Sequence, residues 1–391
     1  MKHSHYGASS ANRWLNCPGS ISLIKDIPAP APNPHAMEGT RAHNLAEYCL
    51  KNSLDAIDLI DEDFSGEPVI QDMAEAVQVY LDYIRKQSSR SAVKVMVETQ
   101  FSLDHIHKGM FGTNDACLFD SMLDTLEVVD YKHGVGVVVS PEENEQLMYY
   151  GLGAAILYKL PSTARVILTI IQPRAMGQTI KTWETTAGFL YDFGEELRQG
   201  VERTKIKDPK LKEGDWCRFC PALATCPQVN TTALSVAQAQ FSDGELILGT
   251  PEEAVNQKLV DISKVLQYAP LITSWFKAVE SMAFQMANSG IPIEGYKLVK
   301  KRANRVWKYE PDELERVLIQ SNGNKKDTNW FTEPKIKSPA QLEKIFGKDF
   351  IGNLCETPDN GNTLVSISDR RQEVKIETLE FDVIDFDTLK E

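Results

Sequence analysis

The chain has 391 residues, of which 42% are hydrophobic and 25% are charged, and this predicts a globular protein of two to three domains. No apolar run is long enough to cross a bilayer and the N-terminus lacks the apolar core of a secretory signal, so we expect a cytoplasmic protein without a membrane partner. The formal net charge of −13 argues against nucleic-acid binding over the whole surface but leaves room for a local basic patch.

The N-terminal half predicts a segment followed by an α/β domain. Residues 1–35 are expected to be irregular, and Pro28, Pro30, Pro32 and Pro34 favour an extended backbone. The pattern then predicts helix, helix, three strands, helix, strand and helix, in a domain that spans residues 36–230 with its cysteine cluster. The elements are expected at about 38–50, 70–86, 93–101, 116–119, 126–132, 141–159, 165–171 and 183–204, and residues 134–139 continue the β pattern.

The C-terminal part predicts a linker and a mixed region. Residues 231–250 are rich in small and polar side chains, and residues 251–391 predict helices interrupted near Pro270 and then a mixed segment that binds DNA or a partner. Tyr296–Lys308 has six basic and two aromatic residues without an acid, which fits a nucleic-acid groove and a solvated face equally. Its candidate DNA-binding residues are Lys300, Lys301, Arg302 and Arg305. Phe381–Glu391 is acidic, which fits either a flexible tail or a partner-docking segment.

Candidate chemistry centres on Asp130-Tyr131-Lys132. Asp130 and Lys132 are two residues apart on a predicted strand, so their side chains leave the same face. Asp115, at the start of the preceding predicted strand, can share one cation with Asp130 if the two strands are antiparallel neighbours. Oxygen ligands of this kind suit Mg²⁺ or Mn²⁺. Taken alone, Asp-x-Lys is more typical of a surface pair on an edge strand.

Four short motifs occur in a fixed order along the chain. They are Gly39-Thr40-Arg41-Ala42-His43, Gly112-Thr113-Asn114-Asp115, Asp130-Tyr131-Lys132 and Gln146-Leu147-Met148-Tyr149-Tyr150. This set resembles the GTxxH, GxxD, DYK and QxxxY motifs of RecB/AddB nuclease domains. The resemblance covers about residues 9–230 and implies the PD-(D/E)XK restriction-endonuclease-like core, a mixed sheet flanked by helices, with a C-terminal α+β extension.

The resemblance implies a role for each matched position. It implies that the Asp115 and Asp130 carboxylates bind the metal, that His43 is an additional metal ligand, and that Tyr131 binds the metal through its backbone carbonyl. Lys132 becomes the group that orients the attacking water and stabilises the transition state. Gln146 and Tyr150, one helical turn apart, become supporting residues that contact DNA, although Tyr150 also fits the buried stripe of its helix.

Several nearby residues have open interpretations. A lone helical histidine such as His43 is more often a surface or core residue than a ligand. Glu47 shares the helix face of His43 and is either a ligand or a solvated acid, and Glu98 either supports the metal site or serves the fold. The sequence departs from the related motifs at Asn114 and at His133, which could alter metal preference or pH response.

The cysteines predict a second centre. Cys217, Cys220 and Cys226 form a compact triplet, and Cys17 is the candidate fourth ligand. The arrangement resembles AddB-type nucleases, in which one cysteine before the nuclease core and three after it hold a [4Fe–4S] cluster. Structural Zn²⁺ held by the same thiolates is the main alternative, and four reduced buried thiols are the other.

The resemblance implies a phage or prophage exonuclease that resects double-stranded DNA ends, located in the cytoplasm of a bacterial host. A single-strand annealing protein is the expected partner, and a homo-oligomer fits ring-forming relatives. Two alternatives stay open: an endonuclease or flap nuclease, and a non-catalytic DNA-end binding or scaffold protein with the same fold.

Overall fold

The computed structural model describes residues 4–27, 34–89, 92–237, 251–302, 305–322, 325, 331–332 and 335–374. The chain divides into two compact units, Met1–Trp275 and Phe276–Glu391, and each is considered by itself. Three predicted features lie wholly or mostly outside the described residues: the extended segment at Pro28–Pro34, the linker from 231 to 250, and the acidic segment Phe381–Glu391. Where the first two are described they are helical instead, since Pro34 begins a helix and residues 231–237 end one.

The first unit is built on a five-stranded mixed sheet with the order β3-β4-β5-β6-β7. Its strands are β3 (Val93–Ser102), β4 (Phe111–Asp120), β5 (Thr125–Tyr131), β6 (Arg165–Ile171) and β7 (Ile180–Thr186). Neighbouring strands are antiparallel except β5 and β6, which are parallel. A parallel pair needs a crossover, and α5 (Glu145–Tyr158) provides it.

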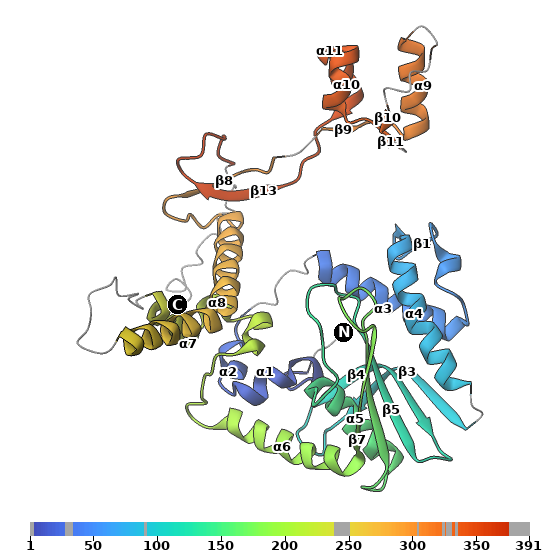
Figure 1. The fold of residues 1–391 in the computed structure, drawn as a ribbon, viewed down its shortest axis with the longest axis vertical. Coiled ribbons are helices and arrows are strands. Elements are labelled where there is room, and N and C mark those ends of the chain that lie inside the picture. The colour runs from blue at the N-terminus through green and yellow to red at the C-terminus, as the bar shows by residue number, and fades with distance from the viewer. Residues whose placement is uncertain are drawn as a thin grey trace, which may run out of the picture. The chain divides into compact units, whose positions relative to one another are not determined.

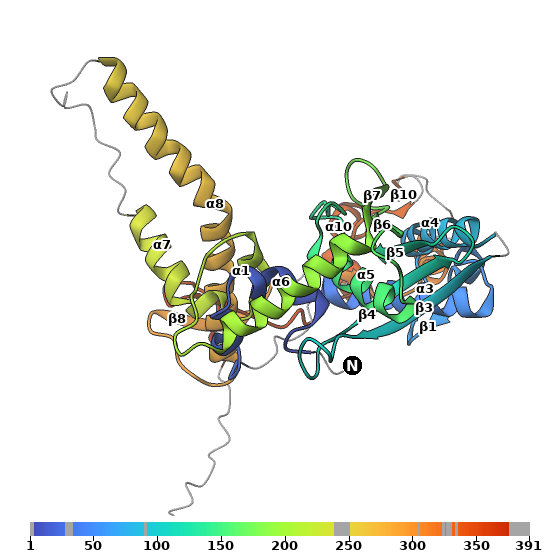
Figure 2. The ribbon, with the colours of Figure 1, turned by 90° about the horizontal axis from the view of Figure 1, so that it is seen from below.

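Helices cover both faces of the sheet (Figures 1 and 2). Helices α3 (Pro34–Asn52) and α4 (Gln71–Ser88) pack on one face, and α5 with α6 (Ala187–Lys205) and the short α1 (Ala11–Asn16) packs on the other. An α/β unit with a mixed sheet flanked by helices was predicted, and this level of the fold is confirmed.

Strand β5 shows how the sequence places the site. Leu126 and Val128 are buried with α5, whereas Val129 and Tyr131 are buried with α3 and α4. A strand that is covered on both faces reads as an almost continuous hydrophobic run, as this one does. The same alternation carries Asp130 to the α5 face at the end of the strand.

The first unit has further short elements near its start, before β3 and after α6. They are η1 (Ala8–Ser10), α2 (Ser20–Leu23), η2 (Ile57–Leu59), β1 (Asp63–Phe64), β2 (Glu67–Pro68), η3 (Asp215–Phe219), η4 (Leu223–Thr225) and α7 (Pro227–Ala237). Helix α8 (Pro251–Asn288) spans the boundary between the units.

The second unit is a mixed segment with a small core of its own around Leu314, Leu318 and Ile351. Its elements are β8 (Tyr296–Lys300), β9 (Val306–Trp307), α9 (Pro311–Ser321), β10 (Phe331–Thr332), β11 (Lys335–Ile336), α10 (Pro339–Phe346), α11 (Lys348–Leu354), β12 (Cys355–Glu356) and β13 (Asn362–Ser366). Across the described part of both units, no helix combines the length and apolarity needed to span a membrane.

Two predictions about strands were wrong. Strand β7 was not predicted, and its last residues, Trp183–Thr186, were assigned to the following helix. They form a strand because β7 pairs antiparallel with β6 over its whole length, from Arg165↔Thr186 to Ile171↔Ile180. Residues 134–139 were predicted to continue the β pattern but form no strand. The Gln172 side chain takes up backbone hydrogen bonds of this segment: it donates to the Gly134 and Val137 carbonyls and accepts from the Val139 amide.

Several helix limits were also misplaced. Helix α5 begins at Glu145 rather than at Pro141, because the Asn144 side chain caps it by accepting from the Leu147 amide. The N-terminal segment was predicted to be irregular, but it contains α1, whose Trp14 is fully buried. Helix α8 continues through Pro270, so the loss of one N–H did not end it.

Candidate metal-dependent active site

Three carboxylates lie in one row across β3, β4 and β5. The register pairs Val97 with Ala116 and Thr99 with Asn114, which places Glu98 opposite Asp115. Continuing the β4–β5 register by one step from Ala116↔Val129 places Asp115 opposite Asp130. Asp115 therefore lies in the interior of β4, because Phe111–Asn114 pair with β3, and not at the strand's start as predicted.

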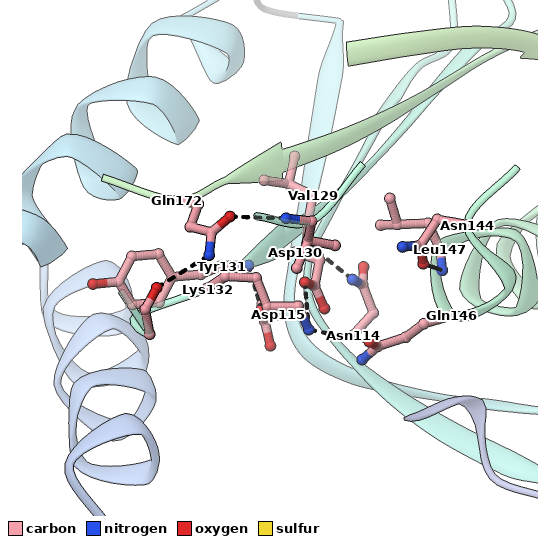
Figure 3. Close-up of polar contacts among 12 residues, drawn as sticks. Asn114, Asp115, Val129, Asp130, Tyr131, Lys132, Asn144, Gln146, Leu147 and Gln172 are labelled. Atoms are coloured by element: carbon pink, nitrogen blue, oxygen red, sulfur yellow. Dashed lines mark hydrogen bonds and ion pairs between the residues drawn. The ribbon is translucent and has the colours of Figure 1, made fainter. Parts of the chain in front are cut away.

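His43 and Lys132 each contact one carboxylate of this row. His43 Nδ1, on α3, lies 3.3 Å from Asp115 Oδ1, and Lys132 Nζ lies 2.8 Å from Asp130 Oδ2. Figure 3 shows Asp115, Asp130 and Lys132 side by side, with Gln146 approaching from α5. The Asp115 carboxylate also accepts a 2.6 Å hydrogen bond from the Tyr131 amide, which fixes its orientation. The structure thus brings together the residues that the DYK, GxxD and GTxxH motifs singled out.

Burial and crowding perturb the acids of this group. Burial raises the pKa of Glu98 to about 7, and the Asp115 carboxylate contributes to the increase. Burial also raises the pKa of Asp130, and this outweighs the nearby Lys132 charge. Burial opposes ionisation of Asp115 as well, but His43 and Lys132 lower its pKa overall. The site therefore concentrates acidic groups, whose negative charge Lys132 and His43 offset in part.

The donor set fits a divalent cation. His43, Glu98 and Asp115 each offer a ligand atom, and the three atoms lie within 4.8 Å of one another. Two oxygens and an imidazole nitrogen suit Mn²⁺, and the carboxylates also suit Mg²⁺. Glu98 was predicted only as a supporting residue, but its position in this group makes it a candidate ligand. Glu47 instead forms an ion pair with Lys51, one turn further along α3.

Helix α5 supports Lys132 through a short chain of hydrogen bonds. Lys132 Nζ donates to the Gln146 side-chain carbonyl at 3.0 Å, and the Gln146 amide donates to Tyr150 Oη at 3.0 Å. Tyr150 is also buried against β4: a Cβ at Gly112 would lie 2.7 Å from the Tyr150 ring. Gly112 is thus a glycine because helix and strand approach closely there. Nothing within 4 Å explains Gly39 in the same way.

The four cysteines predicted as one group line one cavity. Cys17 follows α1, and Cys217, Cys220 and Cys226 lie in or just after η3 and η4. Burial raises the pKa of Cys17, and raises that of Cys217 to about 11, so these thiols need a bound metal to ionise at neutral pH.

Polar atoms around the cysteine cavity also fit a bound group. In the described part of the chain, the buried Arg13 Nε and Ser20 Oγ have no hydrogen-bond partner, and both residues line the cavity. Such donors can satisfy the sulfurs of a cluster. The remaining cysteines, Cys49, Cys117 and Cys355, are buried elsewhere.

The candidate DNA-binding residues belong to the second unit and are partly engaged there. Lys300 forms an ion pair with Asp359, and Arg305 with Glu343. Lys301 and Arg302 are exposed. Two of the four predicted residues therefore already have acidic partners within the unit.

Sequence reasoning missed Arg174. Its guanidinium contacts Glu38, Asp72 and His133, which come from three different elements. No motif contains Arg174, and only the tertiary structure brings these residues together.

Two comparisons bear on relatives. A family model described as "Protein of unknown function (DUF2800)" matches residues 3–372. A solved structure described as "Crystal structure of SSO0001" is 13% identical, covers 58% of this chain and 89% of that chain, and has a TM-score of 0.26. A TM-score this low carries no argument about fold or function.

Proposed function

Because the chain belongs to the DUF2800 family, whose description assigns no function, we propose its function from the site: a metal-dependent deoxyribonuclease with a PD-(D/E)XK core. One observation carries the proposal. Asp115 and Asp130 lie opposite each other on adjacent strands, with His43 3.3 Å from the first and Lys132 2.8 Å from the second. Phosphodiester hydrolysis needs this combination of carboxylates and a positive group.

His43, Glu98, Asp115 and Asp130 would hold Mg²⁺ or Mn²⁺, and the Tyr131 carbonyl is proposed as a further ligand. The bound cation would activate water and neutralise charge on the scissile phosphate. Burial raises the pKa of Glu98 and repulsion from Asp115 adds to the rise, and the bound cation would offset that repulsion.

Lys132 acts as a charged donor in this proposal. Burial disfavours its charged form, but Asp130 and Asp115 raise its pKa overall, so it stays protonated at neutral pH. Its ammonium has three N–H groups, of which Asp130 and Gln146 take two. The third can donate to the attacking water or to a phosphate oxygen. We therefore assign Lys132 to transition-state stabilisation and not to proton abstraction.

On the basis of the motif resemblance, we further propose that the enzyme is an exonuclease that acts on double-stranded DNA ends, with a single-strand annealing protein as its partner. Endonuclease or flap cleavage is the second candidate. For the cysteines, we propose that Cys17, Cys217, Cys220 and Cys226 hold a [4Fe–4S] cluster, with structural Zn²⁺ as the alternative. In either case the group would tie the segment before the sheet to the segment after α6.

The test is digestion of end-labelled linear and closed circular duplexes with Mg²⁺ or Mn²⁺, by wild type, Asp130→Asn and the control Asp192→Asn. Asp192 is an exposed residue of α6. We expect wild type and the control to degrade the linear duplex and Asp130→Asn to be inactive. Cleavage of circles would favour an endonuclease. If wild type degrades no DNA form and Asp130→Asn binds DNA equally well, the non-catalytic scaffold is the better interpretation.

A further inference from the structure

We propose that Arg174 is a positioning residue that holds α3, and with it His43, at the metal site. The inference rests on the proposed function, because it takes His43 as a ligand. Arg174 lies in the loop between β6 and β7. It would not touch metal or substrate but would act through the helix that carries the ligand.

One guanidinium joins three elements around this site. Arg174 Nη1 lies 2.7 Å from Glu38 Oε1 on α3, and Nη2 lies 2.8 Å from Asp72 Oδ2 on α4. Nη1 also lies 2.6 Å from Nε2 of His133, just beyond the end of β5. The Arg174 side chain is only 20% exposed, and a planar fork suits several fixed acceptors better than a single ammonium does.

Helix α3 depends on such polar contacts at its N-terminal end. None of the residues from Pro34 to Arg41 is buried, and the first core residue of the helix is Ala42. This part of α3 is therefore fixed by Glu38, through Arg174, and by Arg41, which donates to backbone carbonyls of the β1–β2 hairpin. His43 lies only five residues after Glu38, about one and a half turns along the helix.

A second route connects Arg174 to His43 through β5. Since Arg174 donates to His133 Nε2, the His133 proton resides on Nδ1, which lies 2.8 Å from Tyr131 Oη and can donate to it. The Tyr131 ring in turn packs edge-on against the His43 ring, with 5.4 Å between centroids. His133 is thus part of this support, facing α3 and α4, and accounts for a departure from the related motifs.

The two routes, one along α3 from Glu38 and one through His133 and Tyr131, both make the position of His43 depend on Arg174. Without the guanidinium, Glu38 and Asp72 lose their shared partner, and His133 loses the donor that fixes its tautomer. Partners that hydrogen-bond directly to a metal ligand typically contribute about 10- to 100-fold to metal affinity, and Arg174, which acts through other residues, is expected near the lower end of this range. We therefore expect a change in metal affinity that exceeds any general loss of stability.

The test is calorimetric titration of Mn²⁺ into the metal-stripped full-length chain, with a thermal melt of each variant. Arg174→Gln is compared with wild type and with the control Arg165→Gln. Arg165 lies at the start of β6 and forms a surface ion pair with Glu184, so the control also removes one guanidinium and one pairing. Glu38→Gln, which keeps Arg174 but removes the carboxylate that joins it to α3 and that also lies 3.4 Å from His133 Nε2, is the second test variant if Arg174→Gln does not fold.

We expect Arg174→Gln and Glu38→Gln to raise the Mn²⁺ dissociation constant at least about tenfold, and Arg165→Gln to leave it unchanged. Nuclease activity of Arg174→Gln should recover at saturating Mn²⁺. An unchanged dissociation constant in both test variants would overturn this inference but leave the proposed function standing. Weaker DNA binding at unchanged Mn²⁺ affinity would also overturn it, and would identify Arg174 as a phosphate contact. If wild type binds no Mn²⁺, the proposed function fails and the inference with it.

Discussion

Glu98 lies opposite Asp115 on neighbouring strands, although its backbone there departs from an ordinary strand. Glu98 has a φ of 47°, a left-handed conformation that non-glycine residues rarely adopt. In a regular strand, residues five apart point to opposite faces, yet Met96 and Phe101 of β3 both pack on the α5 side. The alternation of side chains along β3 therefore shifts by one residue around Glu98. The distortion accompanies a carboxylate placed within reach of His43 and Asp115. Strain of this kind is tolerated where the surrounding structure enforces it, most often at functional sites.

This placement predicts how stability varies with pH. Glu98 has a pKa of about 7 in the folded chain against an ordinary value of 4.5, so the folded state holds its proton more tightly. The metal-free protein should therefore lose stability as pH rises from 4.5 to 7. Asp130, whose pKa is also raised, adds a slope of the same sign. Thermal melts in EDTA from pH 5 to pH 8 should show a smaller decline for Glu98→Gln than for wild type.

Added Mn²⁺ should oppose this decline, because the ionised carboxylate is the form that binds it. We expect the increase in melting temperature produced by Mn²⁺ to grow with pH in wild type and to be smaller in Glu98→Gln. Parallel melting curves for the two proteins, with and without Mn²⁺, would show that Glu98 does not bind the metal.

Lys132→Ala should lower the cleavage rate by about 10²- to 10³-fold, as expected when one group that stabilises the transition state is removed. DNA binding should change less, because the contact strengthens as charge develops on the phosphate. The measurement is the initial rate of label release from a linear duplex. Lys205→Ala, an exposed lysine paired with Glu202 on α6, is the control. A rate within a few-fold of wild type would remove Lys132 from the mechanism.

Local patterns of the sequence predicted the parts of the fold that burial fixes. Strand β6 was placed at Arg165–Ile171, as observed, because six of its seven residues are apolar or β-branched. The alternation along β5 correctly put Asp130 beside Lys132. Strand β7 was missed, because its polar, half-exposed residues gain their role from pairing with β6. The Arg174 network could not be predicted, since no local period relates a loop to α3, α4 and the end of β5.

The cysteine site makes a prediction about residues far apart in the chain. If Cys17 is a cluster ligand, Cys17→Ser and Cys217→Ser should both lose an absorbance band at about 400 nm, which is typical of thiolate-bound iron. Cys49→Ala, which changes a buried thiol outside the cavity, should keep the band. Metal analysis of anaerobically purified protein should find iron. A colourless protein with stoichiometric zinc would identify the alternative, and one without either metal would leave only reduced thiols.

Gly112 and Gly39 should respond in opposite directions to the same substitution. A Cβ at Gly112 would lie 2.7 Å from the Tyr150 ring and 2.9 Å from the Ala8 side chain, so Gly112→Ala must displace α5 or the N-terminal segment. Overpacking of this kind costs about 1–3 kcal/mol. Gly39 lies inside α3 with nothing within 4 Å, and Gly39→Ala should stabilise the helix by about 0.5–1 kcal/mol.

Urea unfolding of the two variants and wild type would measure these changes as shifts of the midpoint. Gly112→Ala should also weaken cleavage, because displacement of Tyr150 breaks the chain through Gln146 that orients Lys132. Gly39→Ala should cleave as wild type does, because nothing lies within 4 Å of the added Cβ. Equal midpoints for Gly112→Ala and wild type would mean that β4 and α5 approach less closely than the structure shows.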